Sequence, residues 1–177
     1  MPAPLNPNRG GTPLRVIKNG GVLEDGWQLF DAAAGTDIPA GGDIIVPLSV
    51  WKAQRDTLLQ RKGRAGVCLQ GEDDPAQLAD DLGVLEMIAL DFPVFKDGRS
   101  YSNARLLRER YGYRGELRAV GDVLRDQIFF MHRCGIDSFQ IRQDRDVSDA
   151  IRGLADFSVT YQAAADGALP LYKNRNP

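Results

Sequence analysis

Basic side chains gather in one stretch of the sequence, from Lys96 to Arg118. The stretch holds seven lysines and arginines against three acids, a local balance of +4, whereas the whole chain carries −2. The rest of the chain therefore carries −6. This separation of charge predicts a surface for an anionic ligand or for an acidic partner.

Two arginines of this stretch are expected to lie close to the core. In a helix over residues 104–111, Arg108 would share the apolar face, and Arg110 would border it. A guanidinium at the edge of a core needs a carboxylate, an aromatic ring or a bound anion. A structural ion pair, of Arg108 with Asp91 or Asp122 for example, is the alternative to an anion site.

The loop before this helix offers a second way to hold an anion. Asp97-Gly98 predicts a turn, and Ser100 or Ser102 is expected to cap a helix that ends near Gly112. Backbone N–H groups at such a helix start can bind an oxyanion beside Arg99. The predicted anion- or partner-binding residues are Arg99, Tyr101, Ser102, Arg105, Arg108, Arg110, Arg118, Arg125, Phe129 and Arg133.

A further helix is predicted from Val123 to Cys134. Its apolar arc contains Phe130 and Cys134, which makes Cys134 a core thiol rather than a reactive one. Phe129 falls on the opposite, polar face among arginines, a composition that is enriched at protein interfaces. Single exposed apolar residues are also routine, so this interpretation competes with an ordinary surface.

Carboxylates at the ends of predicted strands could form another kind of site. Asp91 and Asp122 each follow a strand, at the edge where parallel α/β proteins bind ligands, and Asp97 lies in the loop beyond Asp91. Carboxylate oxygens at such an edge could hold Mg²⁺. For Asp122 we favour the simpler role of N-cap for the helix from Val123.

Several classes of chemistry are excluded by what the sequence lacks. The chain contains neither GxxxxGK[ST] nor GxGxxG after a strand. One histidine, His132, and two cysteines, Cys68 and Cys134, are too few for an iron–sulfur cluster or a dedicated transition-metal site. We therefore expect no cofactor, and neither a nucleic acid nor a membrane as partner. The cysteine usage and the missing signal peptide predict a cytoplasmic protein.

The elements that position these residues are those of an α/β fold. We expect a flexible arm over 1–13, an N-terminal β-hairpin region over 14–48 with its turn at Asn19-Gly20-Gly21, an α/β domain over 49–160 and a tail over 161–177. About four βα units predict a mostly parallel sheet with covering helices. A half-barrel remains open, but we favour an open or partly closed sheet.

The stretch from Pro93 to Phe139 resembles a bacterial family of uncharacterised proteins. That family is linked with sulfite reduction as an oxidoreductase and is typically encoded beside assimilatory sulfite reductase. The matching positions are Asp97, Gly98, Arg99, Tyr101, Ser102, Ala104, Arg105, Arg108, Gly115, Arg118, Gly121, Asp122, Asp126, Gln127, Arg133, Cys134, Gly135 and Asp137. Ile136 stands where the family pattern suggests an aromatic residue. The resemblance implies sulfur assimilation and brings no catalytic residue with it.

Two functions are therefore expected. The first is an accessory protein of assimilatory sulfite reduction that docks on the reductase or its electron donor, or that binds an anion, through the arginine-rich helix. The second is a small α/β enzyme acting on an anionic substrate at the C-terminal edge of the strands, with a metal ion as an option. The oligomeric state is left open, a homodimer included.

Overall fold

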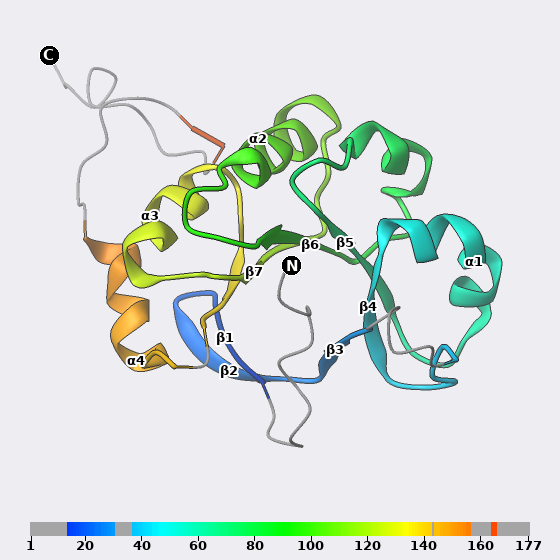
Figure 1. The fold of residues 1–177 in the computed structure, drawn as a ribbon, viewed down its shortest axis with the longest axis horizontal. Coiled ribbons are helices and arrows are strands. Elements are labelled where there is room, and N and C mark those ends of the chain that lie inside the picture. Colours follow the sequence, from blue (N-terminus) through cyan, green and yellow to red (C-terminus); the bar gives the residue numbers. More distant parts are fainter. Residues whose placement is uncertain (1–13, 31–36, 143, 157–163, 166–177) are drawn as a thin grey trace, which may run out of the picture.

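The fold is described from a computed structural model, which describes residues 14–30, 37–142, 144–156, 164 and 165. The arm predicted over 1–13 and most of the tail predicted over 161–177 lie outside the described residues. The described residues form one mixed sheet with helices between its strands (Figure 1). The predicted α/β class and the mostly parallel sheet are confirmed.

The sheet has eight strands in the order β2-β1-β8-β7-β6-β5-β4-β3. From β3 to β8 neighbouring strands are parallel and follow the order of the sequence, whereas β1 is antiparallel to both β2 and β8. The strands are β1 (Leu14–Lys18), β2 (Gly21–Asp25), β3 (Trp27–Leu29), β4 (Asp43–Pro47), β5 (Ala65–Leu69), β6 (Met87–Phe92), β7 (Glu116–Gly121) and β8 (Ser138–Gln140).

The hairpin β1–β2 forms where the sequence predicts it. Asn19 and Gly20 take positive φ angles of 53° and 70°, as a tight two-residue turn between twisted strands requires. Only Gly26 separates the end of β2 from the start of β3. Since β2 and β3 are the two outermost strands of the sheet, this single residue joins its two edges. The sheet is consequently almost a closed barrel, which corresponds to the partly closed form of the open or partly closed sheet that we favour.

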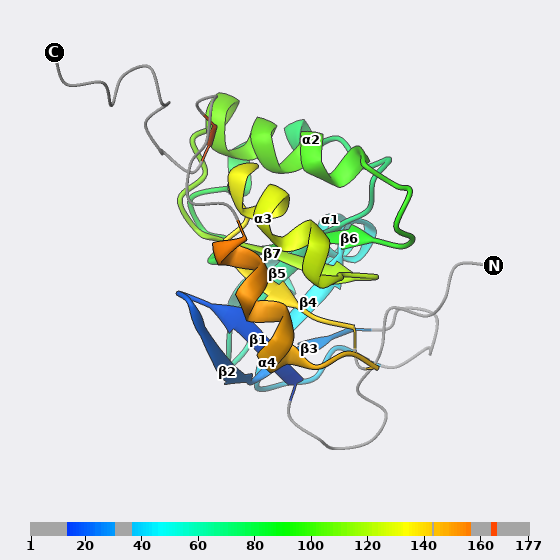
Figure 2. The same ribbon diagram turned by 90° about the vertical axis from the view of Figure 1, so that its left-hand side faces the viewer.

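Helices cover the outer face of the curved sheet, as Figures 1 and 2 show. They are α1 (Leu48–Gln60), the 3₁₀ helix η2 (Pro75–Asp81), α2 (Arg99–Arg105), the π-helix η3 (Leu106–Arg110), α3 (Arg125–Arg133), α4 (Val147–Ala150) and the 3₁₀ helix η4 (Ile151–Ala155). Parallel strands in sequential order have right-handed crossovers that all place their helices on the same side. No helix among the described residues is long and apolar enough to cross a membrane.

The helix starts differ from the predicted ones. Helix α2 begins at Arg99 with Gly98 at the N-cap, so neither Ser100 nor Ser102 caps it. Ser102 is exposed within α2 and caps nothing, while the Ser100 hydroxyl donates a hydrogen bond to the backbone carbonyl of Asp91 (2.5 Å). Side chains that can bond elsewhere in the fold do not mark helix starts reliably.

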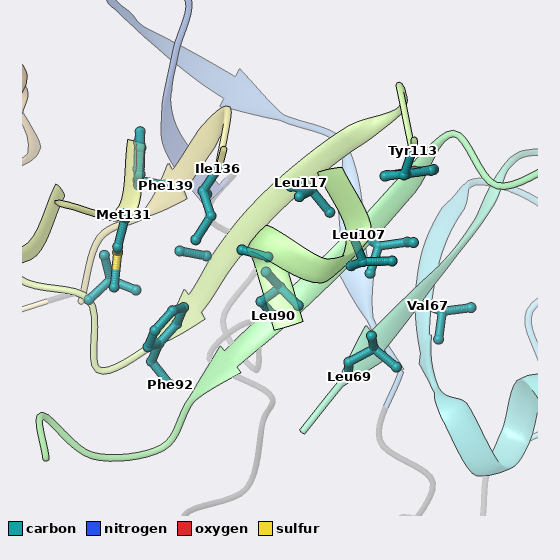
Figure 3. Packing of buried hydrophobic residues seen from close by; sticks show 14 of the residues in the cluster. Val67, Leu69, Leu90, Phe92, Leu107, Tyr113, Leu117, Met131, Ile136 and Phe139 are labelled. Atoms are coloured by element: carbon teal, nitrogen blue, oxygen red, sulfur yellow. The ribbon is translucent and has the colours of Figure 1, made fainter. Parts of the chain in front are cut away.

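The strands carry two apolar faces because their side chains alternate. The outer face packs against the helices in a large cluster that includes Leu90 of β6, Leu107 of η3 and Met131 of α3 (Figure 3). A smaller cluster lines the inner face, with Trp27, Ile45, Cys68 and Met87 among its members. Residues that share the parity of Met87 and Ala89 along β6 therefore point into the barrel, and Asp91 is one of them.

Candidate functional site

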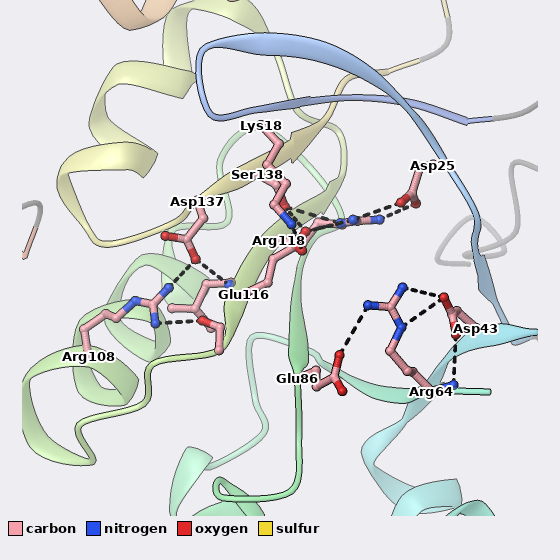
Figure 4. Close-up of polar contacts among 12 residues, drawn as sticks. Lys18, Asp25, Asp43, Arg64, Glu86, Arg108, Glu116, Arg118, Asp137 and Ser138 are labelled. Atoms are coloured by element: carbon pink, nitrogen blue, oxygen red, sulfur yellow. Dashed lines mark hydrogen bonds and ion pairs between the residues drawn. The ribbon is translucent and has the colours of Figure 1, made fainter. Parts of the chain in front are cut away.

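Arg118 lies inside the barrel and is neutralised there. Its guanidinium forms ion pairs with Asp25 of β2 and with Glu116 on its own strand, as Figure 4 shows. The Arg118 side chain is only 2% exposed. Lys18 also pairs with Glu116 (2.6 Å), and the Ser138 hydroxyl donates to the same carboxylate. This network ties β1 and β2 to β7 and β8, and it pairs Arg118 with two carboxylates of its own chain.

Arg108 is the arginine that borders the core, as expected, but its partner is different. It pairs with Asp137 rather than with Asp91 or Asp122 (Figure 4). Its other N–H groups donate to the backbone carbonyls of Gly135 (2.9 Å), Tyr113 (2.7 Å) and Gly115 (2.9 Å). The Arg108 side chain therefore fastens η3 to the segments before β7 and β8, which is a structural role.

The exposed arginines of the predicted set also meet acids. Arg99 pairs with Asp97 (2.6 Å) and Glu72 (3.3 Å), and Arg105 pairs with Glu109 (2.9 Å). Arg125 pairs with Asp149 (3.1 Å) and with Asp156 (3.3 Å). Several of these acids come from distant segments of the chain, which carry the compensating negative charge.

The remaining basic groups of the stretch do not form one surface. Arg110 lies over the ring of Tyr111, with 5.7 Å from its guanidinium carbon to the ring centre. Within the described part of the chain, Lys96, Arg110 and Arg114 make no ion pair, but they lie in three different segments. Arg133 is half-buried near the C-terminal end of α3. The local charge of +4 thus corresponds to paired groups and a few separate cations.

Exposed apolar side chains occur both in the loop between β6 and α2 and on α3. Val94 and Phe95 are 55% and 54% exposed in this loop, and Phe130 of α3 is 58% exposed. The half-buried ring of Tyr101 packs on the buried ring of Phe92 at 5.0 Å and on Phe130 at 5.1 Å. We call Val94, Phe95, Tyr101 and Phe130 the aromatic face.

The aromatic face differs from the one predicted on this helix. Phe130 is the exposed ring, although it was placed on the apolar arc, and Phe129 is half-buried, although it was placed on the polar face. The helix starts at Arg125, two residues later than predicted, and contacts both α2 and η4. The exposed ring and the half-buried ring are therefore the reverse of those predicted. Packing against neighbouring helices, and not the periodicity alone, determines which face of α3 is buried.

Asp91 ends strand β6 with a buried carboxyl group. The residue is 6% exposed, and its Oδ1 has no hydrogen-bond partner within the described residues. Burial is the main reason that the pKa of Asp91 is raised to about 6, and the nearby charges of Asp97 and Glu72 contribute to this rise. A buried polar atom without a partner is rare, and perturbed carboxyls are concentrated at functional sites.

The other two predicted strand-edge carboxylates already form ion pairs with arginines of the same chain. Asp122 pairs with Arg142 (2.8 Å), and it does not cap α3, whose N-cap is Leu124. Asp97 accepts from Arg99, which lowers the pKa of Asp97 to about 2. The described residues contain no group of three or more histidine, cysteine, aspartate or glutamate side chains that could hold a metal ion.

A hollow of about 530 Å³ lies beside the loops that follow β7 and β8. Its lining is mostly acidic and includes Asp126, Asp144, Asp146, Asp149 and Asp156, with Arg125 and Arg145 among them. The sequence pattern did not predict this hollow. The acidic residues between Asp144 and Asp149 were its signal, and the contributions of α3 and of Asp156, which follows η4, cannot be read from them.

Comparison with known proteins agrees with the resemblance at the level of the family. A family model described as "Bacterial protein of unknown function (DUF934)" matches residues 66–172, more than half of the chain. The match begins inside β5, so strands β1 to β4 lie outside it. No curated protein matches the chain significantly. The protein therefore belongs to the DUF934 family of bacterial proteins of unknown function.

Proposed function

We propose that the chain is an accessory protein of assimilatory sulfite reduction that docks on the reductase through the aromatic face. The pathway rests on the resemblance of residues 93–139 described above. The docking role rests on the exposure of Val94, Phe95 and Phe130 and on the packing of Phe130 against Tyr101. Exposed large apolar side chains around an aromatic core are typical of protein-binding surfaces.

An accessory role fits the residues better than direct catalysis of the redox step. Sulfite reduction transfers six electrons through haem and iron–sulfur centres or through flavin and nicotinamide. The two cysteines of this chain are both buried, and no dinucleotide-binding motif occurs in the sequence. Burial also strongly raises the pKa of the Cys68 thiol, which keeps it protonated and unreactive.

The structure changes the expected character of this docking. Since most arginines of the stretch pair with acids of the same chain, we attribute binding to apolar contact rather than to net charge. Apolar association resists salt, whereas association between exposed charges weakens as ions screen it. Binding through the aromatic face should therefore survive about 0.5 M NaCl, at which the Debye length falls to roughly 4 Å.

The decisive experiment measures binding of the purified protein to purified sulfite reductase. Phe95→Ser and Phe130→Ser should each weaken binding by about 30-fold, the loss expected for an interface anchor worth ~2 kcal/mol. Leu23→Ser and Leu59→Ser, at side chains that are 47% and 44% exposed elsewhere, are the matched controls and should bind normally. Unchanged binding by both aromatic variants would refute docking through this face.

The charge-based version of the proposal is tested in the same assay. Arg105→Glu with Arg110→Glu reverses two exposed arginines, one in α2 and one in η3, and should have little effect. If this double variant loses binding and the aromatic variants do not, the arginine-rich helix is the docking surface. A deletion strain should grow on sulfide but not on sulfite, and growth on sulfate would place the protein outside the pathway.

One observation favours the second function, a small enzyme acting at the C-terminal edge of the strands. Asp91 is a buried carboxyl with a pKa of about 6 at the edge where barrel-like α/β proteins carry their active sites. In the deletion strain, Asp91→Asn should then fail to restore growth while Phe130→Ser succeeds. The opposite pattern would reject the enzyme in favour of docking.

A further inference from the structure

The orphaned oxygen of Asp91 requires a donor. A buried carboxylate is strongly disfavoured unless donors replace the water that it has lost. The backbone carbonyl of Asp91 is satisfied by Ser100, but the side-chain Oδ1 contacts no donor in the described part of the chain. Arg99, the basic group beside it, is already held by Asp97 and Glu72.

The charges that face Asp91 are predominantly negative. Glu72, after β5, and Asp97, in the loop before α2, both act on its carboxyl, and both of these acids pair with Arg99. Below Asp91 on the inner face lies the buried Cys68 thiol of β5, which Asp91 also influences electrostatically. This potential repels an anionic ligand and attracts a cation.

Gly121, an exposed residue, lies against the carboxyl group of Asp91. Gly121, exposed at the end of β7, has a φ of +96°, and a Cβ at this position would lie 2.8 Å from Asp91 Oδ1 and 2.6 Å from the carbonyl oxygen of Phe92. Only a residue without a side chain fits against the carboxyl in this backbone conformation. Asp91 Oδ1 therefore lies directly below an exposed stretch of bare backbone.

The nature of the cation follows from the ligand atoms. A metal ion needs several oxygen, nitrogen or sulfur ligands, and no such group occurs among the residues that the structure describes. One carboxylate oxygen instead suits a single charged N–H donor. We propose that Asp91, beneath Gly121, is a binding site for the ammonium or guanidinium group of a ligand. This site is independent of docking through the aromatic face.

The test is a nuclear magnetic resonance titration of the Asp91 carboxyl carbon in the full-length protein. Methylammonium and methylguanidinium chloride should each produce a saturable shift of this resonance at pH 7.5. Tetramethylammonium chloride, a cation of similar charge without N–H donors, should produce none. Because protons compete for the carboxylate, apparent affinity should fall about tenfold when the pH is lowered from 7.5 to 5.

Variants separate this site from general surface binding. Asp91→Asn should abolish saturable binding, followed at the amide resonances of Ser100 and Gly121, whereas Asp126→Asn removes an exposed acid and should bind both probes normally. Equal shifts with tetramethylammonium, no saturable shift with either N–H donor, or binding retained by Asp91→Asn would each overturn the proposal. If Asp91→Asn does not fold, the proposal is tested by the titrations of the natural chain with the three cations and by their pH dependence.

Discussion

Replacement of Asp25 by alanine should destabilise the protein far more than loss of a surface ion pair. The Asp25 and Arg118 side chains are 8% and 2% exposed, so the substitution leaves a buried guanidinium without one of its two carboxylates. Removing one partner of a buried ion pair costs about 3–5 kcal/mol. Glu116 and Ser138 remain beside Arg118, which favours the lower end of this range.

A loss of about 3 kcal/mol is a large share of the 5–15 kcal/mol that stabilises a typical domain. It should lower the melting temperature by roughly 6–12 °C in a protein of this size. Urea unfolding followed by circular dichroism at pH 7.5 measures the free energy of unfolding directly. Hydrogen exchange in β1 and β2 should accelerate as well, since Asp25 ties the hairpin to the barrel interior.

The matched control is Asp43→Ala, which also removes the aspartate partner of an arginine. Asp43 pairs with Arg64 (2.5 Å), but their side chains are 24% and 51% exposed (Figure 4). Exposed pairs contribute about 0–1 kcal/mol. If Asp25→Ala and Asp43→Ala lower the free energy of unfolding equally, the barrel-interior network does not stabilise the fold as argued here.

Two further predictions concern the strand edge. Burial raises the pKa of Asp91 from 3.8 to about 6, so the folded state binds more protons between these values, and stability should fall by up to roughly 3 kcal/mol as the pH rises through this range. Asp91→Asn should remove that decline in pH-dependent urea unfolding, and an unchanged difference between pH 4.5 and 7.5 would contradict it. Gly121→Ala should cost at least about 2 kcal/mol, because positive φ and contact with the Phe92 carbonyl act together. Gly112→Ala, at φ +65° with nothing within 4 Å, should cost only the conformational part, and equal losses would refute the contact.

Local signals in the sequence predict the elements well. The Asn19-Gly20 turn lies where expected, because it depends on the backbone preferences of neighbouring residues. Closure of the sheet could not be predicted in this way. It depends on β2 and β3, which are one residue apart in the chain, pairing with different strands, and no periodicity reports that choice.

The partners of the arginines illustrate the same limit. Counting charge between Lys96 and Arg118 misses Asp25 and Asp137, which reach Arg118 and Arg108 from distant segments. Asp91 could have been identified more sharply, since it is the only charged residue in the otherwise apolar run MIALDF. A carboxyl in a strand that is buried on both faces needs a partner, and the sequence offers none beside it.

The pairing of the first strand, β1, with the last strand, β8, has a consequence for biosynthesis. Strand β1 pairs with β8, so Val16 lies beside Gln140, and the first strands to leave the ribosome have no complete sheet to join until the last strand emerges. Contacts between such distant positions slow folding and expose unpaired strand edges in the meantime. Nascent chains truncated before β8 should therefore be aggregation-prone, and the cell must protect the emerging hairpin for nearly the full duration of translation.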